Sequence, residues 1–268
     1  MKPIFFFTIL FFSLYSKGFA SDSLVLLRRV PISARLFSTD PIGNIYVIKG
    51  NNALVKYNPQ GDSIGFFNEI KKGKIAQIDA SNPLRILLFY NDFGNILVLD
   101  NVLSLKSTIK LNNLGLVNVP CIANSADGSA WLLDPSGMLL KINSKPEISF
   151  TTSLRNVLEK AIDPIYMLEY DRSLYVVDST DGIYKFDQFG LYKTHYPFQT
   201  KELQLFNSYL VYYAAPFLIS YNTLTLQENK ILLPDVQNII QARVERNLLY
   251  ILRKDSLDIY SLETKNGQ

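Results

Sequence analysis

A pattern of about 40 residues recurs along the chain and limits the folds open to it. In each copy an apolar strand ends in a turn, and a second apolar strand ends in an aromatic or aliphatic anchor followed by Asn, Asp or Ser. The copies lie at 45–58, 86–100, 130–143, 174–187, 210–222 and 248–261. Their anchors, Tyr57, Leu99, Ile142, Phe186, Tyr221 and Tyr260, are 42, 43, 44, 35 and 39 residues apart. Short strands at this period are typical of β-propeller blades.

Each hairpin is flanked by one further strand on either side, which gives four strands per unit. Turn pairs such as Asp127-Gly128 join neighbouring strands. The sixth unit has only three strands, and an unassigned strand at 24–30 precedes the first unit. The sequence therefore predicts an all-β, six-bladed β-propeller with four antiparallel strands per blade, closed by the N-terminal strand completing the last blade. Seven blades, a pair of β-sandwiches and a transmembrane β-barrel remain as alternatives.

The first twenty residues have the layout of an export signal. Lys2 precedes an apolar run at 4–14, and the small residues Gly18 and Ala20 occupy the positions before a cut at Ser21. The run is too short to span a bilayer, and no later run reaches the ~20 apolar residues that a membrane helix needs. We predict a signal peptide at 1–20, a single propeller domain at 21–268 without a transmembrane segment, and a periplasmic or cell-surface/extracellular location.

Three segments resemble the repeats of a known family. GNIYVIK (43–49), GSAWLLDPSGMLLKI (128–142) and SLYVVDSTDGIYKFDQFG (173–190) are similar to NHL-type repeats of six-bladed propellers, of an exported bacterial type. As architecture the resemblance covers most of the mature chain, although only the third and fourth units match closely. Because the shared motif is structural, the resemblance implies the fold and little about activity.

Composition excludes several kinds of site. Lys+Arg 27 against Asp+Glu 24 gives a net charge of +3, which is too small to indicate a nucleic-acid partner. One Cys and one His exclude an intramolecular disulfide and multi-histidine metal sites. Cys121 is expected as a buried thiol, Trp131 as a core residue and His195 on an outer strand. The sequence thus predicts no catalytic, cofactor-binding or metal-binding residues, although it does not exclude an enzyme.

Polar residues in the expected loops on one face of the ring are the remaining candidates for chemistry. They are Asn51, Asn52, Asp92, Asn95, Ser136, Thr180, Asp181, Lys254 and Asp255. Metal-dependent lactonase-type propellers need Glu, Asn and Asp side chains that converge on one cation, and no such set is evident here. We interpret these residues as turn formers.

One insertion interrupts the all-β pattern between the third and fourth units. Ser153 is a suitable cap, and Leu154, Val157, Leu158 and Ala161 have helical spacing before Pro164. The spacing predicts a helix of one to two turns at the rim of the ring. It would either cover the channel mouth or present an apolar stripe to a partner, and these four residues are the candidate partner-binding site.

The sequence favours an exported, non-catalytic propeller that binds a protein partner in the cell envelope as a scaffold or complex subunit. Membrane association would be peripheral, through that partner. The alternative is an extracytoplasmic enzyme of hydrolase, lactonase or lyase type, or a protein that binds a sugar or another small ligand.

Overall fold

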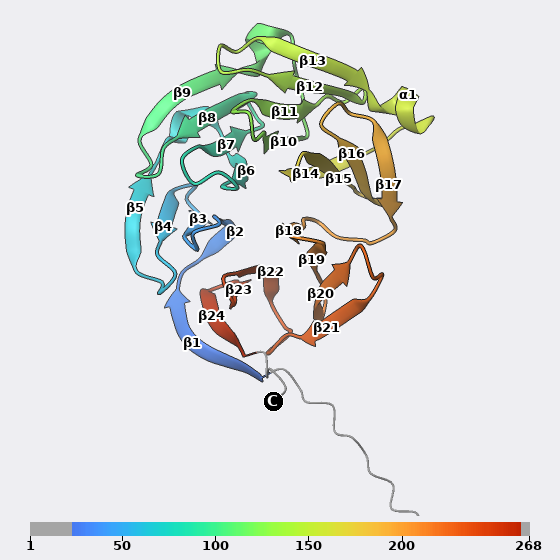
Figure 1. Ribbon diagram of the computed structural model, residues 1–268. Coiled ribbons are helices and arrows are strands. Elements are labelled where there is room, and N and C mark those ends of the chain that lie inside the picture. Colours follow the sequence, from blue (N-terminus) through green and yellow to red (C-terminus); the bar gives the residue numbers. More distant parts are fainter. Residues whose placement is uncertain (1–22, 264–268) are drawn as a thin grey trace, which may run out of the picture.

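Six four-stranded antiparallel sheets surround a central axis in the computed structural model, which describes residues 23–263 (Figure 1). The predicted all-β, six-bladed propeller is confirmed. The predicted signal peptide at 1–20 lies outside the described residues. No helix within the described part of the chain has the length and apolar character needed to cross a membrane.

The first three blades follow one another along the chain, each running from the innermost to the outermost strand. Blade 1 contains β2 (Ala34–Thr39), β3 (Ile45–Lys49), β4 (Leu54–Tyr57) and β5 (Ser63–Phe67). Blade 2 contains β6 (Ile75–Asp79), β7 (Ile86–Tyr90), β8 (Asn95–Leu99) and β9 (Leu105–Lys110). Blade 3 contains β10 (Cys121–Asn124), β11 (Ala130–Leu133), β12 (Met138–Ile142) and β13 (Ile148–Ser153). The short helices η1 (Ile70–Lys72) and η2 (Leu111–Leu114) follow blades 1 and 2.

The next two blades repeat this order, and the sixth differs. Blade 4 contains β14 (Pro164–Tyr170), β15 (Ser173–Asp178), β16 (Gly182–Asp187) and β17 (Tyr192–Tyr196). Blade 5 contains β18 (Gln204–Phe206), β19 (Tyr209–Ala214), β20 (Phe217–Asn222) and β21 (Glu228–Leu232). Blade 6 contains β22 (Ile239–Glu245), β23 (Leu248–Arg253) and β24 (Ser256–Glu263), and its outermost strand is β1 (Ser23–Pro31).

Burial falls from the middle of each blade to its outside. Every residue of β7 and β8 is buried, whereas β9 exposes most of its side chains. The reason is that the middle strands are covered on both faces by neighbouring blades, so both faces are apolar, while an outer strand meets solvent. Apolar clusters therefore lie between blades, as where Leu87 and Phe89 of blade 2 pack with Ile122 and Leu132 of blade 3.

The Asp or Asn that follows each anchor residue forms a turn. The Oδ1 atom of Asp100 accepts hydrogen bonds from the backbone N–H groups of Val102 (3.1 Å) and Ser104 (2.8 Å). Such a side chain fixes the reversal between the third and fourth strands of a blade. Asn58, Asn143, Asp187 and Asn222 accept backbone N–H groups at the same place in their blades. In blade 6 Ser261 replaces them, and no turn is needed there because β24 pairs with β1 rather than with a following strand.

The N-terminal strand closes the ring through an ion pair as well as through its ladder. Arg29 of β1 lies opposite Asp258 of β24 and donates to both carboxylate oxygens, at 2.7 and 2.8 Å. Asp258 is completely buried and also accepts from Arg253 and Ser256. The predicted closure by a strand at 24–30 is therefore confirmed.

Hydrogen bonds also connect the inner strands of adjacent blades at every joint. Three joints use a glutamine amide that donates to and accepts from a backbone group of the next inner strand: Gln77 with Ile122, Gln204 with Val244 and Gln241 with Phe37. The other three use Arg35 to Ile75, Glu169 with Ser125, and Tyr170 with Asn207. These bonds hold the walls of the central channel in fixed register.

Candidate functional site

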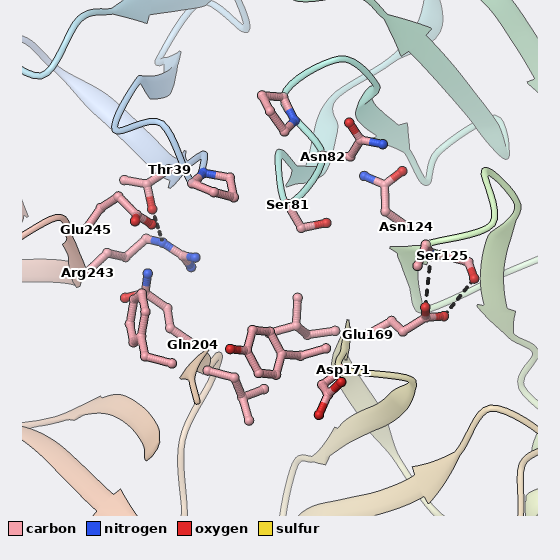
Figure 2. A pocket seen from close by; sticks show the side chains of 17 residues that line it. Thr39, Ser81, Asn82, Asn124, Ser125, Glu169, Asp171, Gln204, Arg243 and Glu245 are labelled. Carbon is pink, nitrogen blue, oxygen red and sulfur yellow. Dashed lines mark hydrogen bonds between the residues drawn. The ribbon is translucent and has the colours of Figure 1, made fainter. Parts of the chain in front are cut away.

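A cavity with a volume of about 550 Å³ forms the mouth of the central channel. It opens among the connections between the first and second strands of the blades, and all six blades contribute lining residues (Figure 2). Because antiparallel strands alternate in direction, the turns between the third and fourth strands lie at the same end of the ring. We call this end the turn face, and we call the opposite end, which carries the blade-to-blade connections, the crossover face.

Arg243 of β22 is the single basic side chain among the described residues that line the mouth cavity. Only 7% of the residue is exposed. Its Nη1 atom donates to Glu202 at 2.8 Å, and its Nε atom lies 3.4 Å from Thr39 Oγ1. Figure 2 shows the guanidinium extending from the wall towards the open centre of the cavity. Burial and pairing together hold this group in one orientation.

Glu169 of β14 belongs to the other side of the cavity in Figure 2. Its carboxylate accepts hydrogen bonds from Ser125 Oγ at 2.7 Å, from the backbone N–H of Ala126 at 2.9 Å, and from Trp131 Nε1. Three donors fix the carboxylate against blade 3. The neighbouring Asp171 lies in the β14–β15 turn with a φ of 45° and also lines the cavity.

Glu245, at the end of β22, is the third carboxylate that lines the mouth cavity. Burial raises its pKa to about 7, and the guanidinium of Arg243 opposes part of this rise. The titration of this group therefore moves from the acidic range towards neutral pH. The negative charge of the cavity therefore depends on pH in the physiological range.

A second cavity, of about 390 Å³, lies nearer the crossover face and includes Tyr166, Glu202 and Gln241 in its lining. Glu202 lines this cavity and Arg243 lines the mouth cavity, so their ion pair crosses the boundary between the two. Burial raises the pKa of Glu202, and Arg243 offsets part of that effect. The Arg243–Glu202 pair thus connects the linings of the two cavities.

None of the nine polar loop residues singled out in the sequence lines either channel cavity. Eight of them lie in loops between the second and third strands of their blades, at the crossover face, and Asn95 is the first residue of β8. Asn52 stabilises the joint between blades 1 and 2. Its side-chain amide donates to the backbone carbonyl of Gly73 and accepts from the backbone N–H of Ile75. Asp181 pairs with Lys160 and Tyr184, and Asp255 lines a separate cavity with Lys254. Within the described residues no three His, Cys, Asp or Glu side chains are placed to hold a metal ion.

The three expectations about single residues are confirmed. Cys121 is a free, fully buried thiol whose pKa is raised by burial. Trp131 is fully buried in the core between blades 3 and 4. His195 lies on the outermost strand β17, where its ring stands 4.7 Å from that of Tyr184. It lines neither channel cavity.

The predicted insertion forms the single-turn helix α1 (Leu154–Leu158), capped by Ser153. Figure 1 places α1 at the periphery of the ring, and none of its residues lines the channel, so the interpretation as a cover for the mouth is wrong. Leu154 is fully buried and Leu158 is partly buried against the core of blades 3 and 4. Val157 and Ala161 are exposed, and they are the part of the predicted stripe that a partner can reach.

The sequence did not point to Arg243, Glu169 or Glu245. Glu169 lies in β14, Arg243 lies in β22 and Glu245 is the last residue of β22. No recognisable sequence motif surrounds any of the three. Their positions carry other residue types in the other blades, such as Ser38 and Asp79 where blade 6 has Arg243, so no repeated pattern marks them.

Comparison with solved structures identifies the same architecture in proteins of different function. No known protein-family model matches the chain, and no curated protein matches its sequence. The WD40 domain of Neurospora crassa Pan2 is 8% identical with a TM-score of 0.66, and the match covers 92% of this chain and 98% of that one. A catalytically inactive histidine-to-alanine variant of virginiamycin B lyase from Staphylococcus aureus, with quinupristin, is 12% identical with a TM-score of 0.65, covering 90% and 100%. BBS1N, in complex with ARL6DN, is 12% identical with a TM-score of 0.61, covering 92% and 99%. At these identities the likeness shows the fold alone.

Proposed function

We propose that the chain is exported to the cell envelope and acts there as a non-catalytic scaffold that binds a protein partner through the turn face. The observation that carries the proposal is a set of apolar side chains at the tips of turns on that face. Val102, Phe189 and Leu224 are 68%, 68% and 81% exposed, in blades 2, 4 and 5.

These three residues occupy the same place in equivalent turns. Each lies two positions after the Asp or Asn that forms the turn between the third and fourth strands, and each donates its backbone N–H to that residue. The turn geometry depends on the Asp or Asn side chain and makes no demand for an apolar group at the tip. In blade 3 the same position is occupied by Lys145. Apolar groups that share one exposed face are typical of interaction sites, and these three tips all lie on the turn face.

The fold and its single histidine support a binding role over a catalytic one. BBS1N has the same fold and was solved with a protein bound. The S. aureus lyase loses activity when a histidine is replaced by alanine. Here His195 packs on an outer strand, with Nε2 against the backbone carbonyl of Asp181 and outside both channel cavities. A chemistry that depends on histidine in the channel therefore has no support in this chain.

The test is photo-crosslinking in cells that express the chain, with the reactive residue placed at Leu224 or, as the matched control, at Lys145. We expect one stoichiometric partner to crosslink through position 224, and much less through position 145. The combined variant Val102→Ser, Phe189→Ser and Leu224→Ser should lose this partner. Its free energy of unfolding should change by less than about 1 kcal/mol, because exposed substitutions cost little. Equal crosslinking from both positions would contradict the proposed face.

The same cells report on export. Fractionation should place the protein outside the cytoplasm, and sequencing of the mature N-terminus should begin at Ser21. A protein retained in the cytoplasm with Met1 intact would refute the export half of the proposal and leave the binding face to be judged by crosslinking.

A further inference from the structure

The mouth cavity has the size of a small-molecule site, since such sites have volumes of roughly 300–1,000 Å³. Its walls are held in place by the hydrogen bonds between the inner strands, including those of Gln204 and Glu169. The cavity is independent of the turn tips, because Val102, Phe189 and Leu224 do not line it. A ligand here would be a function beyond partner binding.

Arg243 supplies the first recognition element. Glu202 and Thr39 engage Nη1 and Nε, and Tyr166 stands beside the guanidinium. Nη2 makes no hydrogen bond to any of the described residues, while Figure 2 shows the guanidinium reaching into the cavity. A fixed guanidinium with a free edge in a partly desolvated cavity matches the oxygens of a carboxylate or a phosphate.

The other charged residues of the cavity lining determine whether a carboxylate or a phosphate fits better. Glu169, Asp171 and Glu245 line the same cavity, and Arg243 is the one basic lining residue in the described structure. A phosphate dianion would meet the carboxylates of Glu169 and Asp171, and that of Glu245 when it is ionised, while the single guanidinium already pairs with Glu202. A carboxylate carries one charge, and a cationic group on the same ligand would meet Asp171 and Glu169 on the other side of the cavity (Figure 2).

The cavity also has apolar walls for the part of a ligand between its two charged ends. Leu168, Leu205 and Phe206 contribute this apolar lining from blades 4 and 5. An uncharged sugar would use the amides and hydroxyls of the cavity, but its hydroxyls carry no charge to match the guanidinium of Arg243, and their hydrogen bonds to it are weaker than those of a carboxylate.

From these contacts we propose that the mouth cavity binds a small zwitterion of the short-peptide class, with its carboxylate on Nη2 of Arg243 and its ammonium group between Asp171 and Glu169. The side chains of such a peptide lie against Leu205 and Phe206.

The test uses L-alanyl-L-alanine and tri-L-alanine as probes, with calorimetric titration and thermal shift as readouts. We expect saturable binding of at least one peptide below 10 mM, and an affinity about tenfold lower or worse when the same peptide is N-acetylated or C-amidated. Asp171→Asn should weaken binding about tenfold. Arg243→Lys should do the same, because it keeps a charge beside Glu202 but lacks the fork.

Matched controls separate a lost contact from a lost fold. Asp92→Asn changes a carboxylate on the crossover face and should leave the affinity unchanged. Asp171 forms no side-chain hydrogen bond with other described residues, so Asp171→Asn remains informative even if Arg243→Lys folds poorly. The Ser variant of the three turn tips should bind the peptide normally. The proposal is overturned if neither peptide binds at 10 mM, if blocking the termini has no effect, or if Asp171→Asn binds like the unchanged chain.

Discussion

The neighbouring arginines Arg28 and Arg29 on β1 form ion pairs that differ in solvent exposure. This difference determines how much each pair contributes to the free energy of unfolding. Arg29 pairs with Asp258, whose side chain has no exposed surface, whereas Arg28 pairs with Asp62 and both partners are about half exposed. Exposed pairs contribute little because water screens them and their side chains lose entropy. Loss of Arg29 is more costly, because it leaves the buried Asp258 carboxylate with Arg253 as its one remaining cationic partner among the described residues.

We therefore predict that Arg29→Met lowers the free energy of unfolding by about 2 kcal/mol, and that Arg28→Met lowers it by less than about 1 kcal/mol. Urea unfolding at neutral pH measures both. Burial tends to raise the pKa of Asp258, but hydrogen bonds from Arg29, Arg253 and Ser256 outweigh it and leave the pKa below its ordinary value.

The direction of that pKa shift fixes the pH dependence of the pair. A carboxyl whose pKa is lowered by folding stabilises the protein above its unfolded pKa of about 3.9, and the contribution is lost as pH falls further. The gap between the unchanged chain and Arg29→Met should hold from pH 7 to about pH 5 and shrink below about pH 4. Equal losses for the two arginine variants would show that closure depends on the strand ladder alone.

At the scale of elements, the turn between the third and fourth strands is the most regularly repeated feature of the ring. In blade 4 the Oδ1 atom of Asp187 accepts from Phe189 at 2.9 Å and from Leu191 at 3.0 Å. Other blades use Asn at this position, so the acceptor oxygen matters more than the charge. Asp187→Ala should cost about 1–2 kcal/mol, while Asp187→Asn should cost less than half of that.

Thermal or urea unfolding of the two variants checks this prediction. Asp187→Asn loses the ion pair with Lys193 but keeps the acceptor oxygen, so it serves as the control for the loss of that ion pair. Similar losses in both variants would mean that the ion pair, and not the turn, is the stabilising contact.

These elements also show what sequence can and cannot predict. Anchors such as Phe186 and turn formers such as Asp187 are adjacent in the chain, so their pattern is local and readable. The α1 insertion was readable as well, but its end at Leu158 depends on Glu159 adopting a left-handed conformation (φ 56°). The mouth cavity could not be predicted from the sequence, because Arg243 and Glu169 line the same cavity only after the six inner strands have closed around an axis.

At the scale of the whole molecule, β1 is an outer strand that only the N-terminal segment supplies. We predict that a chain lacking residues 23–31 loses about 3 kcal/mol or more, since it loses the buried Val30 and leaves Asp258 without Arg29. It should also self-associate through the uncovered edge of β24.

A synthetic peptide of residues 23–33 added in trans should restore stability and suppress self-association, and the same peptide with Arg29→Met should be less effective. Light scattering and denaturant unfolding measure both effects. Full stability of the shortened chain without the peptide would show that five complete blades and a three-stranded sixth are sufficient.

The position of β1 has a consequence for how the molecule is made. Its partner residues lie far along the chain, and the contact between Arg29 and Asp258 joins positions 229 residues apart. Because β1 precedes the other described strands in the chain, it is synthesised before them and is among the last of them to pair, and contacts of such long range form slowly. Until then Leu24 and Val30 have no sheet to cover them, and the growing chain is an open arc with an unpaired edge at each end. The yield of folded protein should depend on how long that arc survives without aggregating, more than on the strength of the finished ring.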